Sequence, residues 1–220
     1  MSEYSRKVVA INLWVIERWC GRRDVVRYPP IPIMCKKRKR MDYFENLVKT
    51  LLEEEYRWVG QSIKVDLSKE EKRKVGKSTI PRPEIDLVVF NYKNNEVIAI
   101  EAKSYLDSSG VSLKDLKEDH KIPEGRYKLF TCKNYREIVF SKLKSQLLEA
   151  KQINNETEIS LGLVAGNIHK NQNEEMSLFF KEKGWLFWGP LDIKERVKEL
   201  SDKGYENNPY IITAKVLLRK

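Results

Sequence analysis

The sequence predicts a domain of the mixed α/β (α+β) class, in which a central mixed β-sheet is flanked by helices. Residues 42–59 carry apolar side chains at helical spacing, whereas residues 84–92 and 96–104 are two largely apolar runs separated by a turn signal. A second stretch with helical spacing, 141–153, precedes another apolar run of strand length, 159–165. Strands and helices in this order indicate a sheet covered by helices.

The first forty-one residues are expected to form a helix and a basic arm. Val8, Ile11, Val15 and Trp19 recur at helical spacing, and Gly21 is suited to end the helix as its C-terminal cap. The next stretch contains three prolines and cannot be helical. It leads into five consecutive cations, which are Lys36, Lys37, Arg38, Lys39 and Arg40.

The clearest predicted helix begins after Asp42 and ends at Gly60. Asp42 is a good N-cap, and Glu45 follows three residues later, as in a capping box. Apolar and polar residues alternate over 63–67, which predicts the first strand. Residues 68–79 are highly charged and contain a glycine, so we expect a loop there.

The next two strands are expected to form a β-hairpin that turns at Asn94-Asn95. In a symmetric hairpin of this kind, Asp86 at the start of the first strand pairs with Lys103 at the end of the second. Residues 105–134 are expected to be mostly irregular. Towards the C-terminus we expect helices over 174–183 and 192–203, a short strand over 185–188 between them, and a last helix after Pro209 that packs through Ile212, Val216 and Leu217.

The composition favours a polyanionic partner. The chain has 42 Lys and Arg against 32 Asp and Glu, a formal net charge of +10 and a pI of about 9.3. Nucleic acid is the first candidate and an anionic membrane the second, while an ordinary basic protein remains the alternative. No apolar run approaches the length that spans a bilayer, and the three cysteines have no metal-binding or disulfide spacing. We therefore expect a reduced, cytoplasmic protein that does not insert into membranes.

Three charged residues of the predicted hairpin are candidates for a catalytic site. Asp86 lies at the same end of the hairpin as Glu101 and Lys103, and the last two share one face of their strand. Two carboxylates at the end of a buried sheet are costly unless they bind a cation, and Mg²⁺ prefers oxygen ligands. Asp86 and Glu101 are therefore expected to bind the metal, while Lys103 positions an attacking water. The alternative is a cross-strand ion pair on a solvated face.

These residues resemble the motif of the PD-(D/E)xK nuclease superfamily. Pro83-Glu84-Ile85-Asp86 corresponds to its first half and Glu101-Ala102-Lys103 to its second, although two residues separate Pro83 from Asp86. The resemblance implies a restriction-endonuclease-like core of a helix, a three-stranded meander, a helix and a further strand over 42–166. It also implies that Glu45 lies near the metal, with a purely capping role as the alternative. Glu84 is either a second acidic ligand or an exposed residue.

Within that superfamily the chain is most similar to a type II restriction endonuclease. The resemblance implies one nuclease domain, with an N-terminal arm (1–41), a catalytic core (42–166) and a C-terminal extension (167–220). The segment 184–190 is expected to be an insertion for specificity or dimerisation. It further implies double-stranded DNA as substrate, a homodimer, and Mg²⁺ as cofactor, with Mn²⁺ as a substitute and Ca²⁺ supporting binding without turnover.

The basic segments are expected to contact DNA phosphates, with a solvated surface as the alternative. Two other functions are left open. One is a structure-specific nuclease such as a Holliday junction resolvase, and the other is a non-catalytic DNA-binding protein with a nuclease-like fold. The residues expected to contact DNA are Lys36, Lys37, Arg38, Lys39, Arg40, Lys74 and Lys77.

Overall fold

The computed structural model describes residues 42–218. They belong to the second of the two units into which the chain divides, Met1–Arg40 and Met41–Lys220. The helix expected over Val8–Trp19 and the cationic run Lys36–Arg40 therefore lie outside the described residues.

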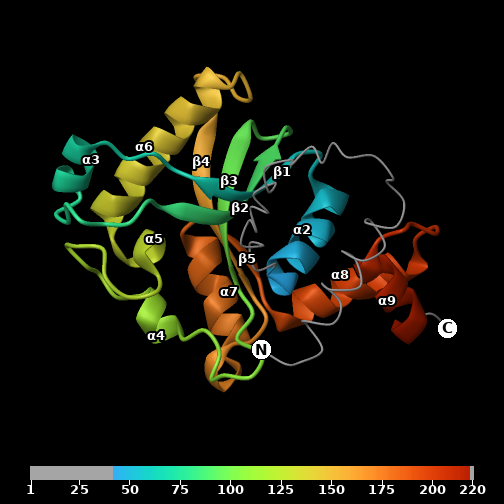
Figure 1. Ribbon diagram of the computed structural model, residues 1–220. Coiled ribbons are helices and arrows are strands. Elements are labelled where there is room, and N and C mark those ends of the chain that lie inside the picture. The colour runs from blue at the N-terminus through green and yellow to red at the C-terminus, as the bar shows by residue number, and fades with distance from the viewer. Residues whose placement is uncertain (1–41, 219–220) are drawn as a thin grey trace, which may run out of the picture. The chain divides into compact units, whose positions relative to one another are not determined.

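A five-stranded sheet forms the centre of the described unit, with its strands in the order β1-β2-β3-β4-β5 (Figure 1). The antiparallel meander consists of β1 (Val59–Lys64), β2 (Glu84–Asn91) and β3 (Glu96–Lys103). Next to β3 lie β4 (Glu158–Ala165) and β5 (Leu186–Trp188), each parallel to its neighbour. The sheet is therefore mixed and helices flank it, as the sequence predicts.

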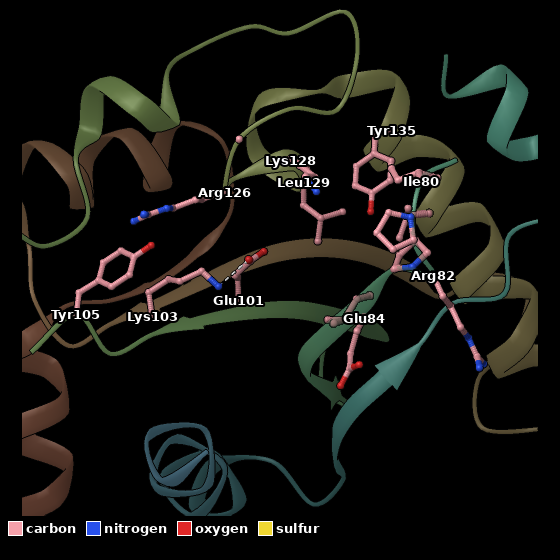
Figure 2. Close-up of a pocket in the computed structure, with 15 residues that line it drawn as sticks. Ile80, Arg82, Glu84, Glu101, Lys103, Tyr105, Arg126, Lys128, Leu129 and Tyr135 are labelled. Carbon is pink, nitrogen blue, oxygen red and sulfur yellow. Dashed lines mark ion pairs between the residues drawn. The ribbon is translucent and has the colours of Figure 1, made fainter. Parts of the chain in front are cut away.

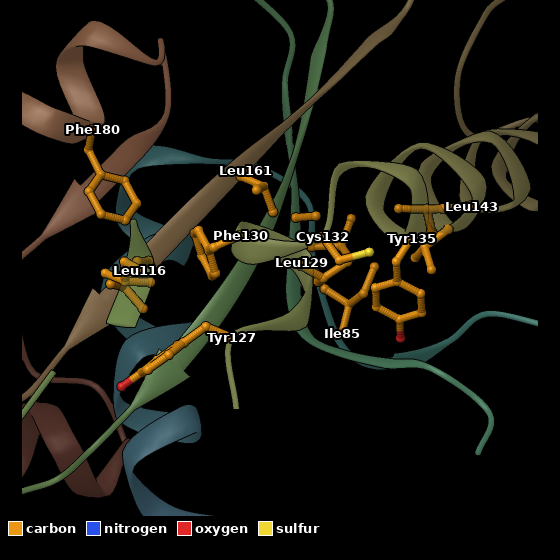
Figure 3. Packing of buried hydrophobic residues seen from close by; sticks show 14 of the residues in the cluster. Ile85, Leu116, Tyr127, Leu129, Phe130, Cys132, Tyr135, Leu143, Leu161 and Phe180 are labelled. Atoms are coloured by element: carbon orange, nitrogen blue, oxygen red, sulfur yellow. The ribbon is translucent and has the colours of Figure 1, made fainter. Parts of the chain in front are cut away.

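One face of the sheet is covered by α5 (Lys128–Thr131), α6 (Lys133–Glu149) and α7 (Asn173–Glu182). Their buried side chains join those of β3 and β4 in one apolar cluster, shown in Figure 3. Leu161 of β4 is fully buried in this cluster. Because β3 contributes Val97 and Ala99 to this face, its odd-numbered residues point towards α6.

The opposite face is covered by α2 (Tyr43–Glu55), α8 (Pro190–Asp202) and α9 (Pro209–Leu218). Leu51 of α2 and Trp188 of β5 are buried in a second apolar cluster on this side. No helix among residues 42–218 has the length and apolar character that a bilayer span requires.

The segment 184–190 is part of the core and is not an appended insertion. Trp188 is buried, and the ring of Phe187 stacks on that of Phe180 with their centroids 5.1 Å apart. Because β5 adds to the sheet and α7 and α8 each cover one of its faces, the region after residue 166 completes both layers.

The helix predicted from Asp42 to Gly60 is too long. The helix α2 ends at Glu55 and Tyr56 is extended, so Val59 and Gly60 belong to β1, where they pair with β2. The predicted loop over 68–79 contains a helix, α3 (Lys69–Lys74), which begins with a complete capping box. In the first case ladder pairing outweighs the apolar pattern, and in the second local capping outweighs the high charge and the glycine on which the loop prediction rests.

Two other helices also differ from the prediction. α6 begins at Lys133, eight residues before the predicted start, because Tyr135 and Val139 continue its buried stripe towards the N-terminus. The predicted irregular region before it holds two short helices, α4 (Leu113–Leu116) and α5. In α9 the buried residues are Ile211 and Ala214, whereas Val216 and Leu217 are 77% and 73% exposed.

The β2–β3 hairpin has a different register from the symmetric one predicted. The ladder pairs Leu87 with Ile100 and Asn91 with Glu96, so the turn contains four residues instead of two. Asn95 adopts a positive φ of 50° in this turn. Continued beyond its last pair, the register sets Asp86 opposite Glu101, and the predicted pairing of Asp86 with Lys103 is wrong by two residues.

Gly166 follows β4, and because it has no side chain it makes room for the residues that follow β3. Its backbone N–H donates to the carbonyl of Lys103 at 2.8 Å, and a Cβ at this position would overlap the carbonyl oxygen of Ser104. We predict that Gly166→Ala lowers the free energy of unfolding by about 1–3 kcal/mol, the usual cost of overpacking. Urea unfolding followed by circular dichroism measures this change.

Gly204→Ala is the matched control, because nothing lies within 4 Å of the Cβ that it would add. Its free energy of unfolding should stay close to that of the wild type. Equal stability of the two variants would contradict the packing that the structure assigns to Gly166.

Candidate active site

Three charged side chains meet at the end of the sheet, and we call them the carboxylate–lysine cluster: Asp86 of β2 with Glu101 and Lys103 of β3. The Nζ atom of Lys103 lies 2.8 Å from Oε1 of Glu101 and 3.5 Å from Oδ2 of Asp86. Glu101 and Lys103 are two residues apart on one strand, so both lie on the α6 side of the sheet (Figure 2). The structure thus brings together the three side chains that the sequence analysis selected.

A distortion of the first two strands of the meander, β1 and β2, positions Asp86. The β2–β3 ladder stops at Leu87, and Oδ2 of Asp86 accepts a hydrogen bond from the backbone N–H of Ala102 at 2.9 Å. On the β1 side, ladder pairing skips Ser62, which has a positive φ of 54°. Leu87 packs on the α2 side of the sheet while Ile85 packs on the α6 side, so the alternation of β2 breaks at Asp86.

The cluster is largely withdrawn from solvent. The side chains of Asp86, Glu101 and Lys103 are 22%, 19% and 19% exposed. These values do not fit the alternative of an ion pair on a solvated face. Groups that are this strongly desolvated and charged are more often found at functional sites.

Burial and mutual charge shift the ionisation of the cluster. Burial, and then the negative charge of Asp86, raise the pKa of Glu101 above its usual range, although Lys103 opposes this rise. Burial alone would lower the pKa of Lys103, but the negative charges of Glu101 and Asp86 outweigh it and raise that pKa. Lys103 is therefore a cation at neutral pH in this arrangement.

A cavity of about 450 Å³ opens beside the cluster, and Glu101 and Lys103 contribute to its lining. Figure 2 shows Arg126 and Lys128 on its walls, together with two tyrosines, Tyr105 and Tyr135. The charge of Lys128 acts on Glu101, where it lowers the pKa and so partly opposes the effect of burial. The cavity therefore carries positive charge close to the two carboxylates.

The sequence analysis missed these four cavity residues. Arg126 and Lys128 lie in a region that was expected to be irregular, with no pattern to select them among other cations. Tyr135 lies in the first turn of α6, before the predicted start of that helix. The helical spacing of Tyr135 with Val139 and Leu143 was the one available signal for its burial.

Two further acidic candidates, Glu45 and Glu84, lie at other positions of α2 and β2. Glu45 lies in the first turn of α2, where its backbone N–H donates to the Asp42 side chain at 3.1 Å, and a metal-binding role for it stays a prediction. Glu84 is exposed, lines the cavity and lies 4.0 Å from Lys64. Within residues 42–218 no three His, Cys, Asp or Glu side chains gather as a metal site, so the cluster supplies two carboxylates.

The predicted DNA contacts of Lys74 and Lys77 also stay predictions. Lys74 ends α3, and its carbonyl accepts a hydrogen bond from Nδ2 of Asn134 at 2.9 Å, which ties α3 to α6. Neither lysine lines the cavity beside the cluster. Comparison of the chain with protein families, curated proteins and solved structures found no significant match.

The raised pKa of Glu101 makes stability depend on pH. Between the usual value of about 4.5 and the higher folded value, the folded protein holds this proton more tightly than the unfolded chain, so the free energy of unfolding falls as the pH rises. We predict that Glu101→Gln removes this fall and raises the melting temperature at pH 7–8 in EDTA. Thermal unfolding at several pH values measures the effect.

Glu55→Gln serves as the matched control, because Glu55 forms an ion pair with Arg196 at 2.8 Å in a more exposed place. This variant should keep the pH dependence of the wild type. If Glu101→Gln also keeps the pH dependence of the wild type, the negative charge of Glu101 does not destabilise the folded protein.

Proposed function

We propose that this chain is a metal-dependent nuclease that hydrolyses DNA phosphodiester bonds at the carboxylate–lysine cluster. The observation that carries the proposal is the sharing of one ammonium group, that of Lys103, between the carboxylates of Asp86 and Glu101. The three groups are largely desolvated at the end of a sheet. Two of them, Glu101 and Lys103, line a cavity with cationic walls. Such groups are costly to bury and suit an anionic substrate with a cationic cofactor.

The two carboxylates fit a hard divalent cation. Asp86 and Glu101 already converge on a single cationic centre, the ammonium of Lys103, and each presents oxygen donors. Mg²⁺ is commonly held by one or two carboxylates, with water and substrate phosphate completing its ligands, and Mn²⁺ accepts the same donors. When bound, such an ion supplies Lewis acidity and lowers the pKa of a bound water.

Lys103 and the cavity cations would act on the phosphate. Because Lys103 is a cation at neutral pH, its ammonium can donate hydrogen bonds to a phosphate oxygen and neutralise its charge. Arg126 and Lys128 add positive charge on the wall of the same cavity. These contacts would orient the scissile group against the carboxylates, and positioning of this kind is a large part of catalysis.

The order of the elements supports the nuclease interpretation. Apart from the short helices α3, α4 and α5, the elements run in the order helix (α2), antiparallel meander (β1–β3), helix (α6) and strand parallel to β3 (β4). This is the order that the PD-(D/E)xK resemblance implies. A restriction endonuclease that cleaves double-stranded DNA as a homodimer is the finer form of this proposal. Cleavage of plasmid DNA at fixed positions, compared with cleavage of a four-way junction, separates it from a structure-specific nuclease.

The proposal is tested first through the metal and its two carboxylates. We predict that the full chain nicks plasmid DNA in Mg²⁺ or Mn²⁺, and that EDTA stops the reaction. Asp86→Asn and Glu101→Gln should each slow cleavage by about 10²-fold or more while they leave DNA affinity nearly unchanged, because they remove metal ligands and no cation. Ca²⁺ should support binding without turnover, because its coordination geometry is looser.

Glu55→Gln, which loses a comparable ion-paired carboxylate outside the cluster, should cleave at the rate of the wild type. Cleavage that persists in EDTA, or full activity of either cluster variant in Mg²⁺, would overturn the proposal. Single-turnover cleavage with excess enzyme and binding by fluorescence anisotropy in Ca²⁺ provide the two measurements.

A second prediction concerns the head group of Lys103. Arg keeps the charge but has a larger planar head that cannot occupy the same point between two carboxylates. We predict that Lys103→Arg slows single-turnover cleavage by about 10²-fold, the scale of a positioned catalytic group, with little change in affinity for DNA.

Lys203 offers a close control, because its Nζ also lies between two carboxylates, at 2.7 Å from Glu54 and 3.0 Å from Glu206. Lys203→Arg should cleave normally. If Lys103→Arg also cleaves like the wild type, Lys103 contributes charge alone and its position has no catalytic role.

A further inference from the structure

The cavity beside the carboxylate–lysine cluster has two chemically different halves. Figure 2 shows Arg126 and Tyr105 on the Lys103 side of Glu101. On the other side of Glu101 lie Leu129 and Ile80, which are buried apolar residues, together with Tyr135 and the charged Arg82 and Glu84. One half is therefore cationic, whereas the other, which we call the apolar half, offers the apolar faces of Leu129 and Ile80 to a flat group.

The hydroxyl group of Tyr135 provides a hydrogen-bonding group in the apolar half of the cavity. Tyr135 is 6% exposed, and in Figure 2 its hydroxyl points into the cavity. Among the described residues, Oδ1 of Asn173 is the one buried side-chain polar atom without a hydrogen-bond partner, so the Tyr135 hydroxyl is open to the cavity and can bind water there. A ligand that replaces this water can take over its hydrogen bond.

The ionisation state of Tyr135 fits a donor. Burial, and then the negative charge of Glu101, raise the pKa of Tyr135 to about 12. The hydroxyl therefore keeps its proton at neutral pH and can donate it to a ring nitrogen or carbonyl oxygen. The cavity volume of about 450 Å³ lies within the range typical of sites for one small ligand.

A nucleotide combines the chemistry of both halves. Its phosphate matches the cationic half, its base has apolar faces that match Ile80 and Leu129, and the edge of the base carries hydrogen-bonding groups for Tyr135. A base inside a duplex offers neither its faces nor its pairing edge, because stacking and pairing occupy them. A base that fills this cavity must therefore be unpaired.

We propose that this cavity holds one unpaired nucleotide of DNA, with its phosphate at Lys103 and its base against Leu129 and the hydroxyl of Tyr135. This inference rests on the proposed nuclease function and specifies its substrate, and it favours a structure-specific nuclease over a restriction endonuclease that cleaves continuous duplex. The preferred DNA is single-stranded, or contains an unpaired nucleotide at the site of cleavage. Continuous duplex is a poor substrate, because a base must first leave the stack.

The first experiment compares three DNA molecules with the full chain. They are a single-stranded oligonucleotide, a closed hairpin duplex of the same sequence, and that hairpin with one unpaired nucleotide. Anisotropy in Ca²⁺ gives affinities, and single-turnover assays in Mg²⁺ give rates. We expect the single strand and the interrupted hairpin to be bound and cleaved about tenfold better than the closed duplex, since unpairing one base is costly. Equal or better binding of the closed duplex overturns the inference.

The second experiment removes only the hydroxyl group. Tyr135→Phe should weaken binding of the single strand about fivefold, the scale of one hydrogen bond, and leave binding of the closed duplex unchanged. It should not lower the melting temperature, because this hydroxyl is open to the cavity. In the control Tyr210→Phe the lost hydroxyl donates to the carbonyl of Tyr43 at 3.1 Å, so binding of both DNA molecules should stay unchanged. An equal loss for both DNA forms in Tyr135→Phe, or no loss, overturns the inference.

The two proposals fail in different ways. If no DNA is cleaved in Mg²⁺ but single strands are still bound better than duplex through Tyr135, the nuclease function is wrong and the assignment of the cavity is supported. If DNA is cleaved with metal but the closed duplex is preferred, the nuclease function is supported and the unpaired-nucleotide site is wrong.

Discussion

The hydrogen bond from the backbone N–H of Ala102 to the carboxylate of Asp86 holds the candidate site together. It forms where the β2–β3 ladder ends and where Ser62 of β1 takes a positive φ, so the start of β2 departs from regular sheet geometry. This departure brings Asp86 to Lys103. It also turns Ile85 towards α6, where it lines the cavity. The site is thus a consequence of a local break in strand alternation, and breaks of this kind are typical of functional positions.

The surrounding core makes this arrangement tolerable. The desolvation that raises the pKa of Glu101 comes from close packing, whereas the negative charges of Glu101 and Asp86 raise the pKa of Lys103 against the effect of burial. Apolar clusters on both faces of the sheet fix the two strands, so the carboxylates cannot simply move apart into water. A buried cluster with two negative charges and one positive charge is not a stabilising device by itself. Its presence is easier to explain by binding than by stability.

The meander and its charged end could be predicted from the sequence, because strand alternation and the long apolar runs restrict where Asp86, Glu101 and Lys103 can lie. The exact register of the hairpin could not be predicted, because it depends on a four-residue turn. This turn is stabilised by Asn95, whose side chain accepts a hydrogen bond from Thr157. Arg126, Lys128 and Tyr135 line the cavity together with residues more than twenty positions away along the chain, such as Arg82 and Glu101. No local pattern encodes this arrangement. Helix ends were misjudged where ladder pairing or capping decided the outcome, as at Val59 and Ser68.

The two outermost strands of the described sheet also govern how copies of this chain can associate. β5 has only three residues, and β1 is distorted at Ser62, so neither offers a long regular row of free backbone groups. Natural proteins use short and kinked outer strands to prevent their sheets from joining edge to edge. A sheet that continues from one copy into the next is therefore disfavoured, and self-association through this unit would have to use helices or loops.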